Sequence, residues 1–425
     1  MTTKYIATLL AFSLVRLASA QTEPDPQRTS DLADWYYQAK EYDKAAGYYI
    51  QLTDIADFNS KKVGAAYNAA CCLALQHKAD SAFLLLEKAA QFGRIDKNNL
   101  LQDPDLNSLH ADKKWNRLLA TLKDKKPLNT NPEKARFVTD DVHRFWKSYG
   151  LYLKDTSNAC SIFKANYFKP ASVGMGDYMG MKVGSINQFV RHIKTHPKLY
   201  GSIRENTLKV DAFKPRFYES FKQLKALYPQ AVFPDVYFVI GAFTSGGTVS
   251  ESGLLIGVNQ ICKDESTNLE ELNFGEQLLM NKLEMLPHVI AHELIHFQQG
   301  GNINDTITLG YAINEGMADF IGELISGKSA NPQVAEWVKG KEQKVWERFK
   351  QDMYFNRYGN WIANYENASE DNFPDLGYWI GYEICKSYYE HAADKQKAIY
   401  DMFHITDYRQ FLKDSQWEEK IKTYQ

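Results

Sequence analysis

Residues 284–299, EMLPHVIAHELIHFQQ, contain the motif HExxH, which places His292 and His296 four positions apart inside an apolar stretch. Side chains with this spacing lie on one face of an α-helix, with their Cβ atoms about 5 to 6 Å apart. Two imidazoles on such a face can bind one metal ion. Pro287 suits the first turn of the helix, because proline lacks the N–H that would be unpaired there. The segment therefore predicts a buried helix that presents His292 and His296 to a metal ion.

The residues around this pair suggest a chemistry. Glu293 directly follows the first histidine, where a carboxylate can take a proton from metal-bound water. Catalytic zinc usually has three protein ligands and one water, so a third ligand is expected. The string NEGMADF contains Glu315, separated from His296 by the eighteen residues 297–314, and Asp319 one helical turn later. Glu315 is the predicted third ligand, and Asp319 is placed to accept the free ring N–H of a ligand histidine.

Together these residues resemble the gluzincin metallopeptidases, whose signature is HExxH followed by a helix that carries Glu and, four positions later, Asp. The resemblance implies Zn²⁺ as the cofactor and a role for each matching residue: metal ligands His292, His296 and Glu315, general base Glu293, and Asp319 as the hydrogen-bond partner of His292.

Several longer strings are similar to a family of exported bacterial zinc-dependent proteases known mainly as a domain of unknown function. They are VYFVIGAFTSGG, GLLIG, HVIAHELIHFQQ and GYWIGY, and the resemblance covers about residues 137–425. No counterpart of the GxMEN segment of aminopeptidases is found, so an endopeptidase is favoured over an aminopeptidase. Tyr378 is the predicted donor to the oxyanion and Tyr382 a second candidate, with core packing as the alternative for each.

These patterns predict a secreted zinc metallopeptidase that hydrolyses peptide bonds in a peptide or protein substrate. The alternative is a non-catalytic exported scaffold that binds a protein partner and uses zinc only to stabilise its fold. A third possibility is a latent enzyme whose N-terminal domain covers the cleft.

The first twenty residues differ from the rest of the chain. Lys4 precedes the apolar stretch 5–17, which only Arg16 interrupts, and the sequence Ala-Ser-Ala follows at 18–20. This pattern is typical of a cleaved secretory signal peptide, and the apolar run is shorter than the roughly 20 residues that cross a bilayer. We expect an exported protein, periplasmic or extracellular, without a transmembrane segment after cleavage. No cysteine follows the cleavage site, which argues against a lipid anchor.

Charge and cysteine content exclude other classes. Cleavage removes two positive charges and changes the formal net charge from -2 to -4, which does not favour a nucleic-acid partner. The five cysteines lack Cys-x-x-Cys spacing, so neither a disulfide framework nor a thiolate zinc site is predicted. Export would still allow one pair among the three cysteines of the C-terminal part.

Residues 31–122 show helical spacing with small residues at the crossing points. Ala46 and Ala82 lie 36 positions apart, near the 34-residue period of tetratricopeptide repeats. We expect two such hairpins and a closing helix, able to bind a protein partner, with a generic helical bundle as the alternative. The predicted organisation is a signal peptide at 1–20, a tetratricopeptide-like domain at 28–123, a linker at 124–135 and a zinc domain at 136–425.

The predicted fold is α+β and mostly helical. The β-branched and aromatic run 232–243 and the glycine-bounded run 253–257 predict two adjacent strands, between segments of helical spacing. Helical repeats are thus followed by a gluzincin-like domain with a small sheet packed on the HExxH helix. The run 253–257 is either an ordinary core strand or a sheet edge to which an extended peptide adds.

Other histidines serve as comparisons. His192 and His196 are also four positions apart, but no glutamate stands between them, and a solvated helix face is predicted. His288 lies one turn before His292, where it is a rival ligand, a substrate contact or, as we favour, a partly buried hydrogen-bonded side chain.

Overall fold

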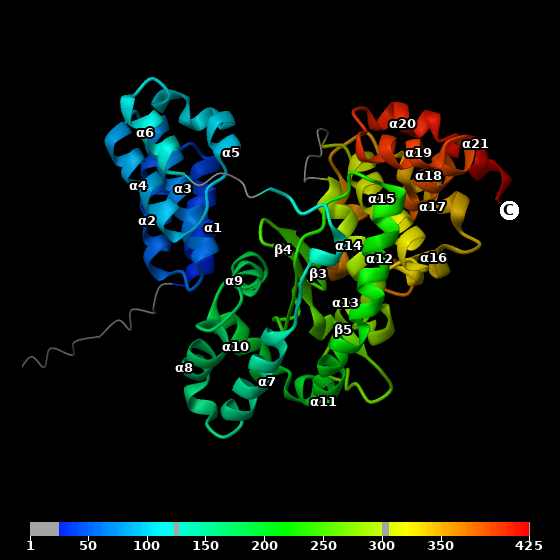
Figure 1. Ribbon diagram of the computed structural model, residues 1–425, viewed down its shortest axis with the longest axis horizontal. Coiled ribbons are helices and arrows are strands. Elements are labelled where there is room, and N and C mark those ends of the chain that lie inside the picture. Colours follow the sequence, from blue (N-terminus) through cyan, green and yellow to red (C-terminus); the bar gives the residue numbers. More distant parts are fainter. Residues whose placement is uncertain (1–24, 123–126, 300–305, 425) are drawn as a thin grey trace, which may run out of the picture.

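The computed structural model describes residues 25–122, 127–299 and 306–424. The helices before residue 122 form one unit, and the rest of the chain forms a larger, mostly helical body around a small sheet (Figure 1). The α+β, mostly helical class is confirmed, whereas the predicted signal peptide lies outside the described residues. Within the described ranges, no helix is both long enough and apolar enough to cross a membrane.

The N-terminal unit begins with two helical hairpins and ends in shorter helices. Its elements are α1 (Pro26–Gln38), α2 (Tyr42–Ile55), α3 (Asn59–Leu75), α4 (Ala79–Phe92), α5 (Lys97–Gln102), η1 (Pro104–Leu109) and α6 (Lys113–Thr121). Both hairpins turn at a residue with positive φ, Lys40 and His77. These residues are 37 positions apart, so the structural period is one residue longer than the predicted offset. The tetratricopeptide assignment itself stays a prediction.

This unit packs on the body through the start of α3. The ring of Phe58 contacts Phe168 edge to face at 5.4 Å, and the Phe58 side chain belongs to the core of the body. The Asp57 carboxylate accepts a hydrogen bond from the backbone N–H of Ile186 at 2.8 Å. Apolar and polar contacts therefore join the two parts.

The first half of the body is helical, as its spacing predicts. Its helices are α7 (Asp140–Tyr152), α8 (Ala159–Phe163), α9 (Val173–Tyr178), α10 (Ile186–Thr195), α11 (Pro197–Thr207) and α12 (Lys214–Leu227). Fully buried aromatic side chains, including Phe145, Phe163 and Phe189, fill the space between them. A π-helical turn, η5 (Met179–Val183), continues α9 toward the sheet.

The main sheet has the order β1-β2-β4-β3. Its strands are β1 (Phe137–Val138), β2 (Val236–Val239), β3 (Gly247–Ser250) and β4 (Gly253–Gly257). The predicted pairing of β2 with β4 is confirmed and is parallel. However, β4 lies inside the sheet, and β3 pairs with it antiparallel and forms the edge. The suggestion that residues 253–257 form an edge is therefore wrong, because the half-buried strand β3 pairs with them on the side away from β2.

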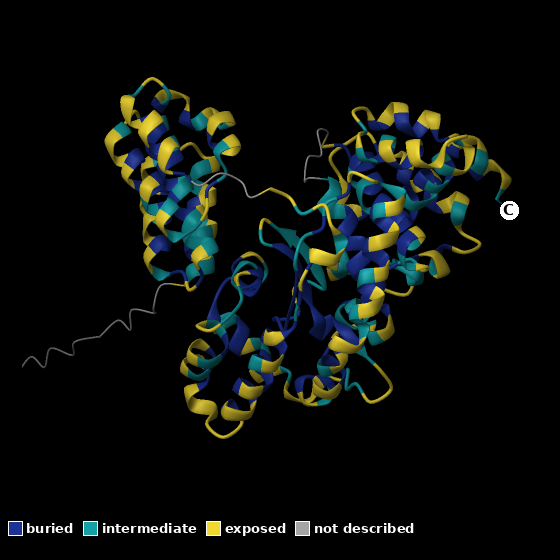
Figure 2. Ribbon diagram, in the orientation of Figure 1, coloured by how far each residue is buried: buried dark blue, intermediate teal, exposed yellow. Residues whose placement is uncertain are grey.

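The second half of the body is again helical. Its elements are the short strands β5 (Ile261–Lys263) and β6 (Asn281–Lys282) and the helices α13 (Phe274–Leu279), α14 (Leu286–Gln299), α15 (Thr308–Ser326), α16 (Pro332–Val338), α17 (Glu342–Lys350), α18 (Leu376–His391), α19 (Lys395–Phe403), α20 (Tyr408–Asp414) and α21 (Trp417–Lys420). Helix α14 packs on the sheet, and α15 packs between α14 and α18. Both helices are largely buried (Figure 2).

Glycines bring these helices close together. A Cβ added at Gly322 of α15 would lie 3.3 Å from the backbone nitrogen of His292, and one added at Gly381 of α18 would lie 1.7 Å from the carbonyl oxygen of Ala312. Helix α15 can therefore approach both neighbours closely, which sets the position of the side chains it carries toward α14.

Candidate metal centre

Helices α14 and α15 bring together the three residues predicted to bind the metal. The Nε2 atoms of His292 and His296 are 3.0 Å apart. The Oε2 atom of Glu315 lies 3.1 Å from Nε2 of His296 and 3.6 Å from Nε2 of His292. All three donor atoms lie within 4.8 Å of one another, so they can share one ion.

The other ring nitrogen of each histidine is held by an oxygen atom. Nδ1 of His292 lies 2.8 Å from Oδ1 of Asp319, and Nδ1 of His296 lies 2.7 Å from Oε1 of Gln299. Both oxygens are acceptors, so each Nδ1 donates its N–H and each Nε2 keeps a lone pair for a cation. Asp319 thus lies where the sequence predicted it. Gln299 was missed, although its place one turn after His296 on the same helix was a usable signal.

Three electron-pair donors face one another in this cluster and repel each other unless positive charge lies between them. Burial disfavours charge on His292, but hydrogen bonds that its ring donates to the carboxylates of Asp319 and Glu315 outweigh burial and hold its pKa well above the usual value. Burial likewise raises the pKa of Glu315, yet the adjacent His296 and His292 outweigh it and depress that pKa strongly. The site therefore stabilises positive charge.

The geometry of the cluster fits zinc. Two nitrogen ligands at about 2.0 to 2.1 Å from a tetrahedral ion lie about 3.3 Å apart, close to the 3.0 Å between the histidine nitrogens. Two imidazoles and one carboxylate are also a donor set that zinc commonly takes. Of the chain's residues, His292, His296 and Glu315 would hold the ion, and Asp319 and Gln299 would orient the two rings.

The neighbouring carboxylate of Glu293 points to the sheet side of the cluster. Its side chain is almost fully buried, and burial raises its pKa. A Cβ at Gly247 of β3 would lie 2.2 Å from Oε1 of Glu293, so only glycine allows the edge strand to approach this closely. Glu293 therefore stands beside the ligands, between α14 and β3.

The two tyrosines of α18 lie in different places. The ring of Tyr378 stacks on that of His292, with centroids 5.9 Å apart, and it lines the cleft over the cluster. The hydroxyl of Tyr382 donates to Glu323 at 2.7 Å and lines a different cavity. The candidate role of Tyr382 at the site is therefore wrong, because one helical turn carries it past the cleft.

His288 and His192 test the interpretations of the other histidines. His288 is buried, with Nδ1 2.8 Å from Oγ of Ser326 and Nε2 3.2 Å from the Arg216 guanidinium. Burial and Arg216 lower its pKa to about 4, so it is a neutral, hydrogen-bonded core residue as favoured. His192 is largely buried instead of solvated, because its helix packs against Tyr200.

A second group of donors, in the N-terminal unit, does not require an ion. Cys71, Asp103 and Asp105 also place possible ligand atoms close together. The hydroxyl of Tyr67 donates to Asp103 at 2.7 Å, and that of Tyr37 donates to Asp105. Burial raises the pKa of the Cys71 thiol, so it stays protonated. Phenolic protons therefore satisfy these carboxylates.

The fold and the site define a mostly helical protein in which a cluster of two histidines and a glutamate, one histidine buried and the other two side chains half-buried, joins two crossing helices beside a small sheet. The sequence matches the family of the gliding motility protein GldB over residues 129–419, more than half of the chain. The chain therefore belongs to this family. No curated protein and no solved structure matches it.

Family membership corrects the functional prediction. The matched family is a lipoprotein family of gliding motility and not a peptidase family, so the assignment as a gluzincin-type zinc metallopeptidase is wrong, and with it the predicted hydrolase activity. The spacing of HExxH places two histidines on one helix face, which permits metal binding but specifies no reaction. The general-base role of Glu293 and the oxyanion role of Tyr378 depended on that reaction and are not retained. A lipoprotein family implies an exported, envelope-associated protein, in agreement with the predicted export.

Proposed function

We propose that this protein is a non-catalytic, partner-binding component of an envelope-associated machinery for gliding, and that a zinc ion at His292, His296 and Glu315 stabilises its body. Family membership supports the place of action, because a motility component acts through other proteins. The observation that carries the metal part is the convergence of three donor atoms from two helices within 4.8 Å.

The position of the site explains what the ion would do. When bound, zinc supplies a cross-link between α14 and α15 and the positive charge that balances the facing donors. Helix α14 packs on the sheet, and β3 at the sheet edge lines a cleft of about 650 Å³ together with the cluster. An ion here would therefore stiffen the wall of the cleft beside the edge strand, which suits a docking site.

The test uses the purified mature chain. We expect about one zinc per chain by elemental analysis, and a chelator should lower the unfolding temperature by about 5 to 10 °C, because a ligand at a thousand times its dissociation constant adds about 4 kcal/mol. Zinc, but not magnesium, should restore the original temperature, since nitrogen donors do not suit magnesium.

Three results would contradict the proposal. If the chelator leaves the unfolding temperature unchanged, the ion does not stabilise the protein, and this part of the proposal is wrong. If the wild type cleaves a peptide library and the Glu293→Gln variant does not, the protein is an enzyme, which contradicts the non-catalytic role. Failure of the tagged protein to co-purify any envelope protein after cross-linking in gliding cells would argue against a partner-binding role.

A further inference from the structure

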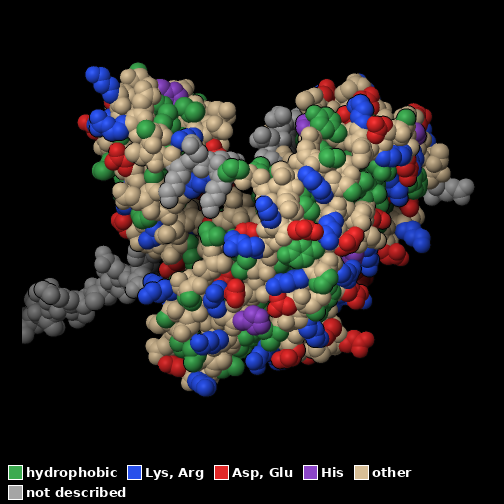
Figure 3. All heavy atoms as spheres, in the orientation of Figure 1, with side chains coloured by type: hydrophobic (Ala, Val, Ile, Leu, Met, Phe, Trp, Pro, Cys, Tyr) green, Lys and Arg blue, Asp and Glu red, His purple; other side chains and the backbone are tan. Residues whose placement is uncertain are grey.

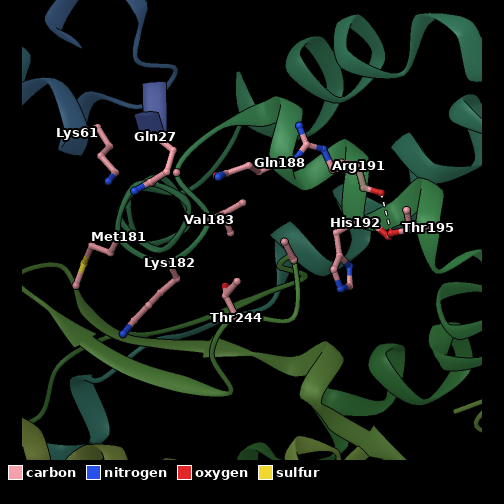
Figure 4. Close-up of a pocket in the computed structure, with 12 residues that line it drawn as sticks. Gln27, Lys61, Met181, Lys182, Val183, Gln188, Arg191, His192, Thr195 and Thr244 are labelled. Carbon is pink, nitrogen blue, oxygen red and sulfur yellow. Dashed lines mark hydrogen bonds between the residues drawn. The ribbon is translucent and has the colours of Figure 1, made fainter. Parts of the chain in front are cut away.

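A second cavity lies where the N-terminal unit meets the body. It has a volume of about 410 Å³. Helices α1 and α3 supply Gln27 and Lys61, and η5 and α10 supply Lys182 and Arg191, around the same space (Figure 4). No aspartate or glutamate of the described chain lines it. The cavity therefore combines residues from both parts of the molecule and is positively charged.

The three cations of this cavity, Lys61, Lys182 and Arg191, form no ion pair in the ranges that the structure describes. Of the three, Lys182 also lines the neighbouring cleft, where it interacts electrostatically with Glu293. Elsewhere acidic and basic side chains are interspersed over the visible face (Figure 3). Cations gathered in a concave, partly buried site focus the local potential and attract an anion, although the whole chain carries a formal net charge of -2.

Two buried polar atoms of residues that line the cavity are hydrogen-bond acceptors without a donor among the described residues. The hydroxyl of Tyr200 donates to the carbonyl of Gly241 at 2.7 Å, so it accepts the Nδ1–H of His192 at 3.0 Å. Nε2 of His192 then carries a lone pair, and it is buried without a partner, as is Oε1 of Gln188. A phosphate or sulfate ion offers acceptors, whereas a peptide offers N–H donors as well as a carboxylate.

The cavity continues into the cleft over the metal centre. Lys182 and Thr244 line both. In the cleft, Gln260 is 3% exposed, and its Nε2 is a buried donor without a partner in the described residues, suited to a peptide carbonyl. The edge strand β3 (Gly247–Ser250) lies along the same cleft, and such an edge can pair with an added strand.

We infer that this continuous groove binds an extended, acidic segment of a protein partner, with a carboxylate held among Lys61, Lys182 and Arg191 and the backbone running past Gln260 along β3. The inference rests on the proposed partner-binding function and specifies its surface and the chemistry of its partner. It also gives the N-terminal unit a role, because Lys61 completes the anion site.

Fluorescence anisotropy with the full mature chain tests the inference. The probes are fluorescein-labelled peptides of about ten residues, a usual strand length, in which glutamate alternates with valine, or glutamine replaces every glutamate. We expect the acidic peptide to bind at least about tenfold more tightly than the glutamine peptide at low salt, with the difference shrinking as salt rises. Equal binding of the two peptides would overturn the inference.

Variants locate the anion site. The double variant Lys61→Gln, Arg191→Gln should bind the acidic peptide about tenfold more weakly than the wild type does, and its affinity for the glutamine peptide should be unchanged. Lys194→Gln, which removes an exposed charge of α10 outside the cavity, is the matched control and should bind like the wild type. Unfolding temperatures equal to that of the wild type show that the variants fold. An unchanged affinity of the double variant for the acidic peptide would overturn the inference.

Three further outcomes separate this inference from its alternatives. Binding of inorganic phosphate or of phosphatidylglycerol vesicles that requires Lys61 and Arg191, with no binding of the acidic peptide, would assign the cavity to phosphate and overturn the inference. If the double variant still co-purifies the same envelope proteins as the wild type, the inference fails while the proposed function stands. If the wild type co-purifies none, the proposed function itself fails.

Discussion

His192 in the last turn of α10 and His196, the C-cap residue of that helix, form a pair (the pair on α10) with the same spacing as His292 and His296 on α14, yet the two pairs have different surroundings. The rings are similarly close, with centroids 4.1 Å apart on α10 and 4.6 Å apart on α14. On α10 the rings stack, with an interplanar angle of 21°, whereas on α14 they meet edge to face at 82°. The edge-to-face arrangement turns both Nε2 atoms to one point.

The second helix makes the larger difference. Helix α15 brings Glu315 and Asp319 to the pair on α14, and their hydrogen bonds raise the pKa of His292. In the pair on α10, His192 contacts the hydroxyl of Tyr200, and neither histidine pairs with a carboxylate of the described residues. Burial lowers the pKa of His192 to about 3. Spacing of four residues therefore creates only the possibility of a metal site, and the carboxylates of a neighbouring helix decide whether the rings attract a cation.

The largest expected effect comes from removing the carboxylate that distinguishes the two pairs. Glu315→Gln should weaken zinc binding at least about a hundredfold, because even loss of a residue that only orients a ligand costs about 10 to 100-fold. Glu293→Gln is the matched control: it removes the same charge beside the site but no ligand atom, and should keep zinc. Isothermal titration with zinc measures both. Full affinity in Glu315→Gln would show that the glutamate is not a ligand.

A smaller effect should follow from moving α15 away. The side chain in Gly381→Ala would place a Cβ 1.7 Å from the carbonyl oxygen of Ala312, so α18 and α15 must separate. We expect a loss of about 1 to 3 kcal/mol in the free energy of unfolding, measured in urea, and weaker zinc binding. Gly150→Ala, in a helix where an added Cβ meets nothing within 4 Å, should be neutral or stabilising. Equal stability of the two variants would contradict the close crossing.

The smallest effect concerns the pair on α10. His192 has a pKa of about 3 in the folded protein and the ordinary histidine value of 6.5 when unfolded, so between these values the unfolded chain binds a proton that the folded one does not. Its contribution is complete above pH 6.5 and decreases as the pH falls toward 3. We expect a loss of about 1 to 2 kcal/mol between pH 7 and pH 4.5.

This loss should be absent in His192→Asn and present in His404→Asn, which replaces an exposed histidine. Denaturant unfolding of the three proteins at both pH values measures it. A His192→Asn variant with the full pH dependence of the wild type would show that His192 is protonated in the folded state.

The sequence predicted the elements whose pattern is local. The helix with Pro287 in its first turn, the adjacent strands around 236–239 and 253–257, and the linear motif of the metal ligands all appear where expected. It did not predict β3, because GTVS is short and polar and becomes a strand only by pairing with β4. It also assigned a reaction to the motif that membership of the gliding motility family contradicts.

By itself, the sequence determined which side chains share a helix face, because that depends only on 3.6 residues per turn and on nearby apolar residues. The tertiary structure decided what those faces meet. Helix α15 brings carboxylates to one histidine pair, and Tyr200 packs against the other. The junction of the two parts brings Lys61 to Lys182 and Arg191, which are more than a hundred positions later in the chain. Contacts between distant segments depend on the packing of the whole core, and no local pattern encodes them.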